Sequence, residues 1–229
     1  MADDSAKLIE EEGQWHLVAK ELEDENLKLA SYDNTLLPLL GDLKGKKVLD
    51  YGAGPGVLAL AIKRLGGDIV VYDINPDMLK SAGEKIGSEN IFHSIGEIPQ
   101  NTFDIVICNL VVCIVSEDEV KEIVHNITAA LNTDGTAYIG FCNPKIFNIP
   151  ESNLDLRFQT GDGYEVNHRY KKVKKEGGYE IIEDHRPIEW YEGVYKDAGL
   201  TLVDKYFTPE YELKGNKVQD FIIFKLKKA

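Results

Sequence analysis

Three glycines and two aspartates are the residues in this sequence whose types and spacing best suit chemistry. Gly52, Gly54 and Gly56 lie in the stretch YGAGPG, between an apolar run and a helix-like segment. Asp50 precedes this stretch, and Asp73 ends the next apolar run. Glycines let a ligand approach the backbone closely, and a strand-end acid can accept hydrogen bonds from both hydroxyls of a ribose. The pattern predicts a site for a nucleoside-containing cofactor.

The glycine spacing separates two kinds of cofactor loop. A dinucleotide-binding loop reads G-x-G-x-x-G, and its third glycine packs the helix against the strand. Here the spacing is G-x-G-x-G, and Val57 stands where that third glycine would be. The spacing therefore counts against a nicotinamide-dependent dehydrogenase, which stays an alternative that NADH binding would test.

The elements that must position these residues alternate between strands and helices. Apolar runs predict strands at 46–52, 68–73, 90–95, 103–112 and 135–142. Helices are expected after Gly56, after Asn75 as N-cap with Pro76 in the first turn, and after a Ser116–Glu119 capping box. This alternation is typical of α/β proteins with a parallel, doubly wound sheet.

The rest of the chain departs from this alternation. A helix is expected over 5–30, and a short segment, Thr35–Leu40, leads to the first strand. Residues 144–186 are polar and predict an inserted β-hairpin, and a helix at 187–199 precedes two closing strands. The basic run 169–175 is interpreted as the solvated face of this hairpin, with contact to a nucleic acid or an acidic substrate as the alternative. We therefore predict one domain, 1–229, with an N-terminal helical cap (1–40), a cofactor-binding core (41–143), an inserted lid (144–186) and a closing part (187–229).

The composition limits the function classes. The net charge of −13 would repel a phosphate backbone, which makes a nucleic acid an unfavourable partner. No run is long and apolar enough for a membrane span, and the N-terminus lacks a secretory pattern, so we expect a cytoplasmic protein. Cys108, Cys113 and Cys142 show no zinc-binding spacing and are interpreted as buried apolar residues. No metal site is predicted.

Four stretches, in this order and spacing, resemble the successive motifs of class I S-adenosylmethionine-dependent methyltransferases. They are VLDYGAGPG, VVYDINPDML, FDIVICNLVV and LNTDGTAYIGF, which span residues 48–141. The resemblance implies a Rossmann-like fold with a seven-stranded, mostly parallel sheet. It also implies S-adenosylmethionine as the cofactor and methyl transfer as the activity.

The resemblance places the cofactor residue by residue. Asp50 and the glycine loop would hold the methionine part, Asp73 the ribose, and Ile74 the adenine. Many members use an acidic residue to contact the adenine amino group, and in this chain Ser94 stands at that position, so adenine could be bound by Ser94, by the nearby Glu97 or by a backbone group. The residues expected to contact the cofactor are Tyr32, Asp50, Gly52, Ala53, Gly54, Gly56, Asp73, Ile74, Ser94, Ile95, Asn109 and Leu110.

The methyl acceptor is expected to bind under the insert. A small molecule accepting the methyl group on oxygen or nitrogen is favoured, because the chain is short and acidic. His168 and His185 are the candidate general bases, since an imidazole titrates near neutral pH, although His185 in the segment HRP also fits a structural role. Aromatic residues of the acceptor pocket are expected to be Phe147, Phe158, Tyr164, Tyr170, Trp190 and Tyr191. A catalytically silent cofactor-binding module is the alternative function.

Overall fold

The computed structural model describes residues 27–158, 163–175 and 180–229. The predicted helix over 5–30 lies outside these residues except for its end at 27–30. Residues 35–40, expected as a separate short segment, are instead the second half of helix α3 (Leu27–Leu40). This helix contains Pro38.

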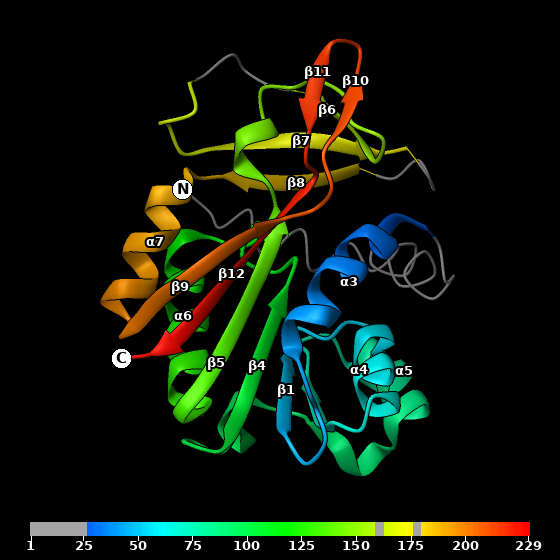
Figure 1. Cartoon of the computed structure of the whole chain (residues 1–229), viewed down its shortest axis with the longest axis vertical. Coiled ribbons are helices and arrows are strands. Elements are labelled where there is room, and N and C mark those ends of the chain that lie inside the picture. Colours follow the sequence, from blue (N-terminus) through cyan, green and yellow to red (C-terminus); the bar gives the residue numbers. More distant parts are fainter. Residues whose placement is uncertain (1–26, 159–162, 176–179) are drawn as a thin grey trace.

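A seven-stranded sheet forms the centre of the molecule (Figure 1), which confirms the predicted fold class. Its strand order is β3-β2-β1-β4-β5-β12-β9, and only β12 runs antiparallel to its neighbours. The strands are β1 (Lys47–Tyr51), β2 (Asp68–Tyr72), β3 (Ile91–Phe92), β4 (Phe103–Asn109), β5 (Leu131–Cys142), β9 (Leu200–Phe207) and β12 (Phe221–Lys228).

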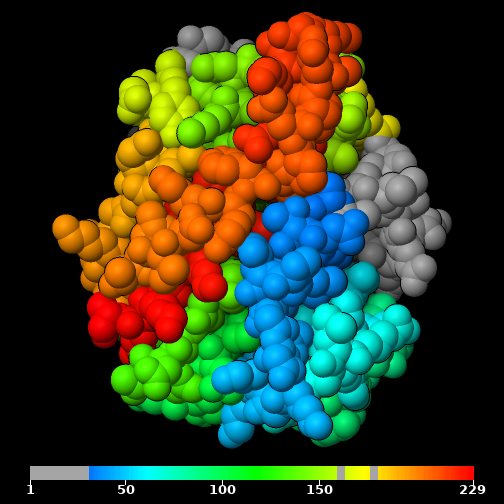
Figure 2. All heavy atoms as spheres, in the orientation of Figure 1, coloured from blue at the N-terminus to red at the C-terminus, as the bar shows by residue number. Residues whose placement is uncertain are grey.

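Helices cover both faces of this sheet. They are α4 (Val57–Arg64), α5 (Pro76–Ile86), α6 (Glu117–Ala130) and α7 (Ile188–Asp197), with α3 already given. Helices α3, α4 and α5 share one buried cluster with the sheet, and α6 and α7 share the other. Figure 2 shows α3 in blue, between the cyan side of α4 and the orange segment that includes β9. Among the residues that the structure describes, no helix combines the length and the apolar character needed to cross a bilayer.

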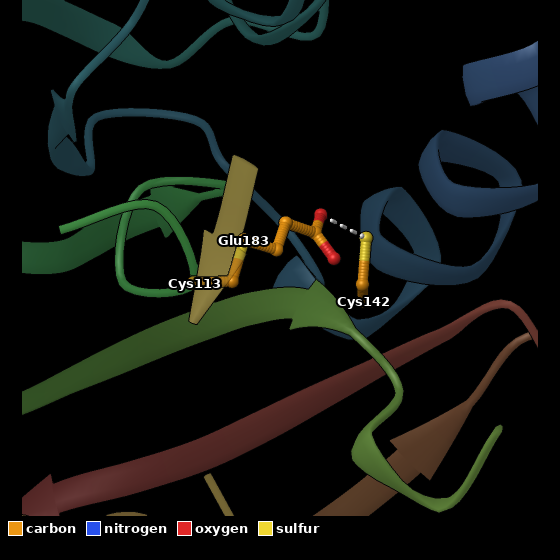
Figure 3. Close-up of side chains that lie close together, drawn as sticks. All are labelled: Cys113, Cys142 and Glu183. Atoms are coloured by element: carbon orange, nitrogen blue, oxygen red, sulfur yellow. Dashed lines mark hydrogen bonds between the residues drawn. The ribbon is translucent and has the colours of Figure 1, made fainter. Parts of the chain in front are cut away.

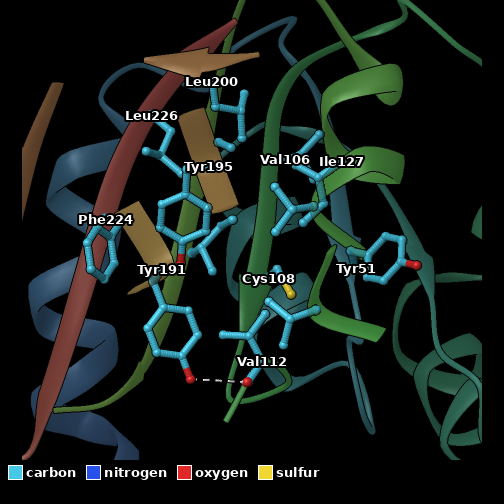
Figure 4. Packing of buried hydrophobic residues seen from close by; sticks show 14 of the residues in the cluster. Tyr51, Val106, Cys108, Val112, Ile127, Tyr191, Tyr195, Leu200, Phe224 and Leu226 are labelled. Atoms are coloured by element: carbon cyan, nitrogen blue, oxygen red, sulfur yellow. Dashed lines mark hydrogen bonds between the residues drawn. The ribbon is translucent and has the colours of Figure 1, made fainter. Parts of the chain in front are cut away.

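Aromatic residues of α7 fill the space above the antiparallel part of the sheet (Figure 4). The ring of Tyr195 lies 5.2 Å from that of Phe224 on β12, and Tyr191 lies 4.3 Å from Phe141 on β5. The Tyr191 hydroxyl donates to the carbonyl of Val112, at 3.3 Å. This bond anchors the chain just after β4 to the last helix.

Two predicted helix starts are confirmed in detail. The Asn75 side chain accepts from the backbone N–H groups of Asp77 and Met78, and Pro76 opens α5. Ser116 and Glu119 form the complete capping box at the start of α6. Both predictions depend on contacts within four residues, so local sequence was sufficient.

A second sheet lies over the end of the large sheet at which β4 and β5 terminate (Figure 1). It consists of β6 (Asp155–Phe158), β7 (His168–Lys174) and β8 (Glu180–His185), all antiparallel. The predicted hairpin is present as β7 and β8, and β6 adds a strand that was not predicted. A further unpredicted hairpin, β10 (Tyr211–Leu213) and β11 (Asn216–Val218), precedes β12.

The basic run 169–175 is only partly the solvated face that its charge indicates. Arg169 and Lys171 are exposed, but the side chain of Lys172 is 1% exposed and lies among Asp155 and Glu183. The alternation of a strand turns Lys172 inward. The interpretation of the run as solvent-exposed was therefore wrong at Lys172.

Candidate cofactor and acceptor site

The glycine loop turns sharply between β1 and α4. Gly52, Gly54 and Gly56 all have positive φ angles, of 77°, 53° and 77°. The N–H groups of Gly52 and Ala53 both donate to the carbonyl of Tyr72 at the end of β2, at 2.7 and 3.0 Å. The loop is thus joined to the neighbouring strand by its own backbone.

The glycines have different neighbours. A Cβ at Gly56 would lie 2.8 Å from the Cα of Ala82, so this glycine lets α4 start against α5. A Cβ at Gly52 would collide with Val111. A Cβ at Gly54 would meet no atom within 4 Å. Packing therefore accounts for two of the glycines, and Gly54 faces open space where a ligand could approach.

Asp73 joins the loop to the start of α5. Its Oδ2 accepts from the N–H of Gly54 and its Oδ1 from the N–H of Asn75, both at 2.8 Å. Burial raises the pKa of Asp73, and these backbone donors act in the opposite direction. The next side chain, Ile74, is 72% exposed, an apolar surface beside a half-buried carboxylate. A polar group and a flat apolar patch are thus adjacent, as a nucleoside requires.

Asp50 is a buried carboxylate in this structure. Its side chain is 2% exposed, and burial raises its pKa to about 7, with smaller contributions from Asp73 and Asp33. Burial also raises the pKa of Asp33, on α3, to about 6. Three carboxyl groups therefore share one region, which is suited to a cationic ligand. Asp33 was missed in the sequence, where its only signal was its place beside Tyr32.

Tyr32 connects α3 to the ends of β4 and β5. Its hydroxyl donates to Oδ1 of Asn109, and its ring packs edge-on against Phe221 at 5.3 Å. A Cβ at Gly140 would overlap the Tyr32 hydroxyl, so the contact requires glycine there. Leu110, the residue after Asn109, has a φ of 60°, and its N–H donates to the carbonyl of Gly140 at 2.7 Å. These residues lie together, and their cofactor roles stay a prediction.

The proposed adenine region is exposed. Ser94 and Ile95 are both exposed, and Ser94 caps a single 3-10 turn, η2 (Ile95–Glu97), without a side-chain hydrogen bond. Glu97 accepts from the N–H of His93 at 2.8 Å. The predicted strand 90–95 was too long, because the chain turns away after Phe92. A role for Ser94 or Ile95 in binding adenine stays a prediction.

The two histidines lie opposite each other in the second sheet. His168 on β7 pairs in register with His185 on β8, and their rings are 5.6 Å apart. Nε2 of His185 lies 2.8 Å from the carbonyl of Tyr164, and its ring stacks on Phe147 at 3.6 Å. Burial lowers the pKa of His185. Because Nε2 faces a carbonyl oxygen, it carries the proton, and Nδ1 is the basic atom.

The second sheet is fastened to the chain that follows β4. The N–H of Asp184 donates to the carbonyl of Cys113 at 2.8 Å. Arg186, buried and missed as a functional residue, donates to the carbonyls of Val112 and Val115 at 3.0 and 2.6 Å. The insert therefore lies on the strand ends beside Asn109 and Leu110.

The aromatic residues expected around the acceptor divide into two sets. Phe147, Tyr170 and Tyr191 are buried, and the first two belong to the insert itself. Phe158 is 56% exposed, because β6 turns this residue outward. Its expected place in an enclosed acceptor pocket does not agree with that orientation.

The fold and the site together define the class of the protein: a class I methyltransferase fold with a glycine loop and a strand-end aspartate. Residues 48–135 match the family model described as a methyltransferase domain. The chain therefore contains a methyltransferase domain, as its motifs predicted, and its fold is the one that S-adenosylmethionine-dependent methyltransferases share.

Several of the relatives in sequence match only a short stretch of the chain. Ribosomal protein L11 methyltransferase of Ralstonia nicotianae is 39% identical over 70 residues, which cover 29% of this chain and 24% of the relative. The chain thus spans about a quarter of the length of the curated relatives that it matches first.

Solved structures match over nearly the whole chain. The magnesium protoporphyrin IX methyltransferase of Synechocystis covers 100% of this chain and 99% of its own, with a TM-score of 0.64 and 13% identity. The 1,6-didemethyltoxoflavin-N1-methyltransferase of Burkholderia thailandensis covers 98% of this chain and 87% of its own, with a TM-score of 0.63 and 16% identity. These likenesses show a shared fold.

Proposed function

We propose that this chain transfers the methyl group of S-adenosylmethionine to an oxygen or nitrogen atom of a small molecule. The observation that carries the proposal is the position of the insert. Its strand β8 is hydrogen-bonded to the segment after β4, beside the strand ends where open α/β sheets bind their ligands. We adopt the predicted boundaries of this lid, 144–186, as part of the proposal.

The cofactor would be held by the glycine loop and the acidic region. Asp73 would bind the ribose hydroxyls, Ile74 would cover the adenine, and Asp50 with Asp33 would face the cationic methionine part. The exposure of Ile74, the open space at Gly54 and the burial of Asp50 support this assignment. When bound, the cofactor supplies a methyl group on a positively charged sulfur, and alignment supplies much of the rate.

His185 and His168 would accept the proton of an acceptor hydroxyl or ammonium group. The lowered pKa of His185 keeps its imidazole neutral at neutral pH, which a general base requires. The contacts of its ring with Phe147 and Tyr164 fix its orientation. Replacement of either histidine by Gln should reduce turnover with a hydroxyl acceptor and leave the affinity for the cofactor largely unchanged. The control is His125→Gln, at an exposed position on α6.

A small acceptor is favoured over a macromolecule. The net charge of −13 opposes a nucleic acid. The two structural neighbours described above are named for acceptors of small-molecule size, and the match to the ribosomal protein L11 methyltransferase covers only 29% of this chain. The free thiols of the three cysteines support a reducing compartment such as the cytoplasm.

The experiment that tests this function separates binding from turnover. Calorimetric titration with S-adenosylmethionine and S-adenosylhomocysteine should show micromolar binding that Asp73→Asn abolishes and that the exposed control Asp77→Asn retains. A small-molecule acceptor library is then screened for products heavier by one methyl group. Failure of the cofactor to bind would overturn the proposal. Binding without turnover on any acceptor would favour the silent cofactor-binding module.

A further inference from the structure

Two cysteines lie in a buried cluster of charged residues that methyl transfer does not use. Cys113 follows β4, Cys142 ends β5, and Glu183 reaches them from β8 (Figure 3). The two sulfur atoms and a carboxylate oxygen of Glu183 all lie within 4.8 Å of one another. Segments distant in the sequence thus bring two thiols together beneath the insert.

Cys142 has the environment of a reactive thiol. Nζ of Lys172 and Oε1 of Glu183 each lie 3.1 Å from its sulfur. Interaction between the two thiols lowers the pKa of Cys142 and raises that of Cys113. The carboxylate can accept the thiol proton, and the ammonium stabilises the thiolate that remains. Cys142 is therefore the attacking sulfur, and Cys113 is the resolving thiol.

The ion pairs around this sulfur contain more cations than anions. Lys172, Lys174 and Arg157 all pair with Asp155, and Lys172 also pairs with Glu183. Three cations thus face two carboxylates in these pairs. A thiolate at Cys142 balances their charge. A metal cation does not, because the Lys172 ammonium already contacts two of the atoms that would bind it.

The cavity beside the two sulfurs limits what can react there. It is lined by Cys113, Cys142, Glu183, His185 and their neighbours, and the space open to water-sized molecules is about 10 Å³. That space corresponds to about one water molecule. A bulky disulfide reagent does not fit, but hydrogen peroxide is only slightly larger than water. Cys142 itself is half-buried, so a small oxidant can reach it.

We propose that Cys113 and Cys142 form a peroxide-reactive thiol pair that closes to an intramolecular disulfide. The Cys142 sulfur attacks one oxygen of hydrogen peroxide, the O–O bond breaks, and the sulfur becomes a sulfenic acid as one water leaves. The Cys113 sulfur then attacks the Cys142 sulfur, and the hydroxyl leaves as a second water with the Cys113 proton. In total, two thiols are oxidised to one disulfide and one peroxide is reduced to two waters.

The disulfide would join the segment after β4 to the end of β5 at the edge of the acceptor region. This proposal depends on the thiol cluster and not on methyl transfer. Its test therefore uses thiol chemistry, and it can fail while the proposed function holds, or the reverse.

The test oxidises the reduced full chain with hydrogen peroxide. Titration of free thiols after denaturation should fall from three to one, and peptide mass mapping should identify a Cys113–Cys142 crosslink. Cys108→Ser, in the apolar core, should form the same crosslink. Cys113→Ser should stop at the sulfenic acid on Cys142, which dimedone traps when it is added together with the denaturant, because the folded cavity is too small to admit it. Lys172→Met should slow the reaction about tenfold, and Lys171→Met, at an exposed neighbouring position, should not.

Three outcomes would overturn the proposal. The first is that the wild-type chain keeps all three thiols at peroxide doses that oxidise free glutathione. The second is a crosslink that includes Cys108 or joins two molecules. The third is a Cys113→Ser variant with native circular dichroism and no dimedone adduct on Cys142. The dimedone measurement on Cys113→Ser tests the proposal even if Lys172→Met fails to fold.

Discussion

Replacement of Asp50 by Asn tests whether the site sacrifices stability for cofactor binding. The side chain of Asp50 is 2% exposed, and burial raises its pKa from the usual 3.8 to about 7. The folded state therefore holds the Asp50 proton more tightly than the unfolded chain does. The stability that this carboxyl contributes is complete below pH 3.8 and is lost as the pH rises through about 7.

The size of the effect follows from the two pKa values. Each pH unit between them changes the free energy of unfolding by about 1.4 kcal/mol. Between about pH 5 and pH 8 the wild-type protein should therefore lose about 3 kcal/mol through Asp50. Asp50→Asn carries no titratable group, so the variant should gain about that much relative to wild type over the same interval. Its affinity for the cationic cofactor should fall at least about tenfold at pH 8.

The assay is urea denaturation of both proteins across this pH interval, with and without S-adenosylmethionine. The quantity compared is the difference between the two free energies of unfolding, because Asp33 and Asp73 titrate in both proteins. The matched control is Asp42→Asn, at an exposed position shortly before β1. A difference that stays constant with pH, or a variant less stable than wild type at pH 8, would refute the reasoning.

The remaining predictions concern residues that hold the site in shape. Gly54→Ala should weaken cofactor binding, measured by calorimetry, and should lower the free energy of unfolding by about 1 kcal/mol. Gly56→Ala should lower the free energy of unfolding several times more, as measured by thermal unfolding. Gly140→Ala should lower the free energy of unfolding by about 1–3 kcal/mol through its clash with Tyr32, and it should cost much less in a Tyr32→Ala background, where the clashing ring is already absent. Arg186→Lys should cost about 2–4 kcal/mol in urea denaturation, because one ammonium cannot reach both carbonyls that the guanidinium bonds; an unchanged midpoint would contradict that.

Local sequence was sufficient for the cofactor half of the fold. The Asn75 cap, the Ser116 capping box and the glycine loop depend on residues within a few positions of one another. The end of β1 at Tyr51 and the start of α5 at Pro76 were placed to within a residue. The contacts of Asp73 were predicted only in part. Its hydrogen bond from the N–H of Gly54 forms only when β1 and β2 are paired, which local sequence does not show.

Strand β6 and the buried charges of the insert could not be predicted in this way, because there the charged residues lie inside and the apolar residues outside. In β6, Asp155 and Arg157 point inward, while Leu156 and Phe158 are exposed. If apolar residues are assumed to be buried, the sequence predicts that the opposite face of β6 points inward, or predicts no strand there. Lys172 was misplaced for the same reason. Only the three-dimensional pairing of these charges shows that they belong to one buried cluster.

The position of β12 has a consequence for how the chain reaches its native state. This strand comes after the other six in the sequence, yet it lies between β5 and β9 and pairs with both. During synthesis from the ribosome, β5 is made long before its partner and exposes an unpaired edge. The large sheet can be completed only after residues 221–228 have emerged, so chaperone dependence should be greatest for nascent chains that stop short of them.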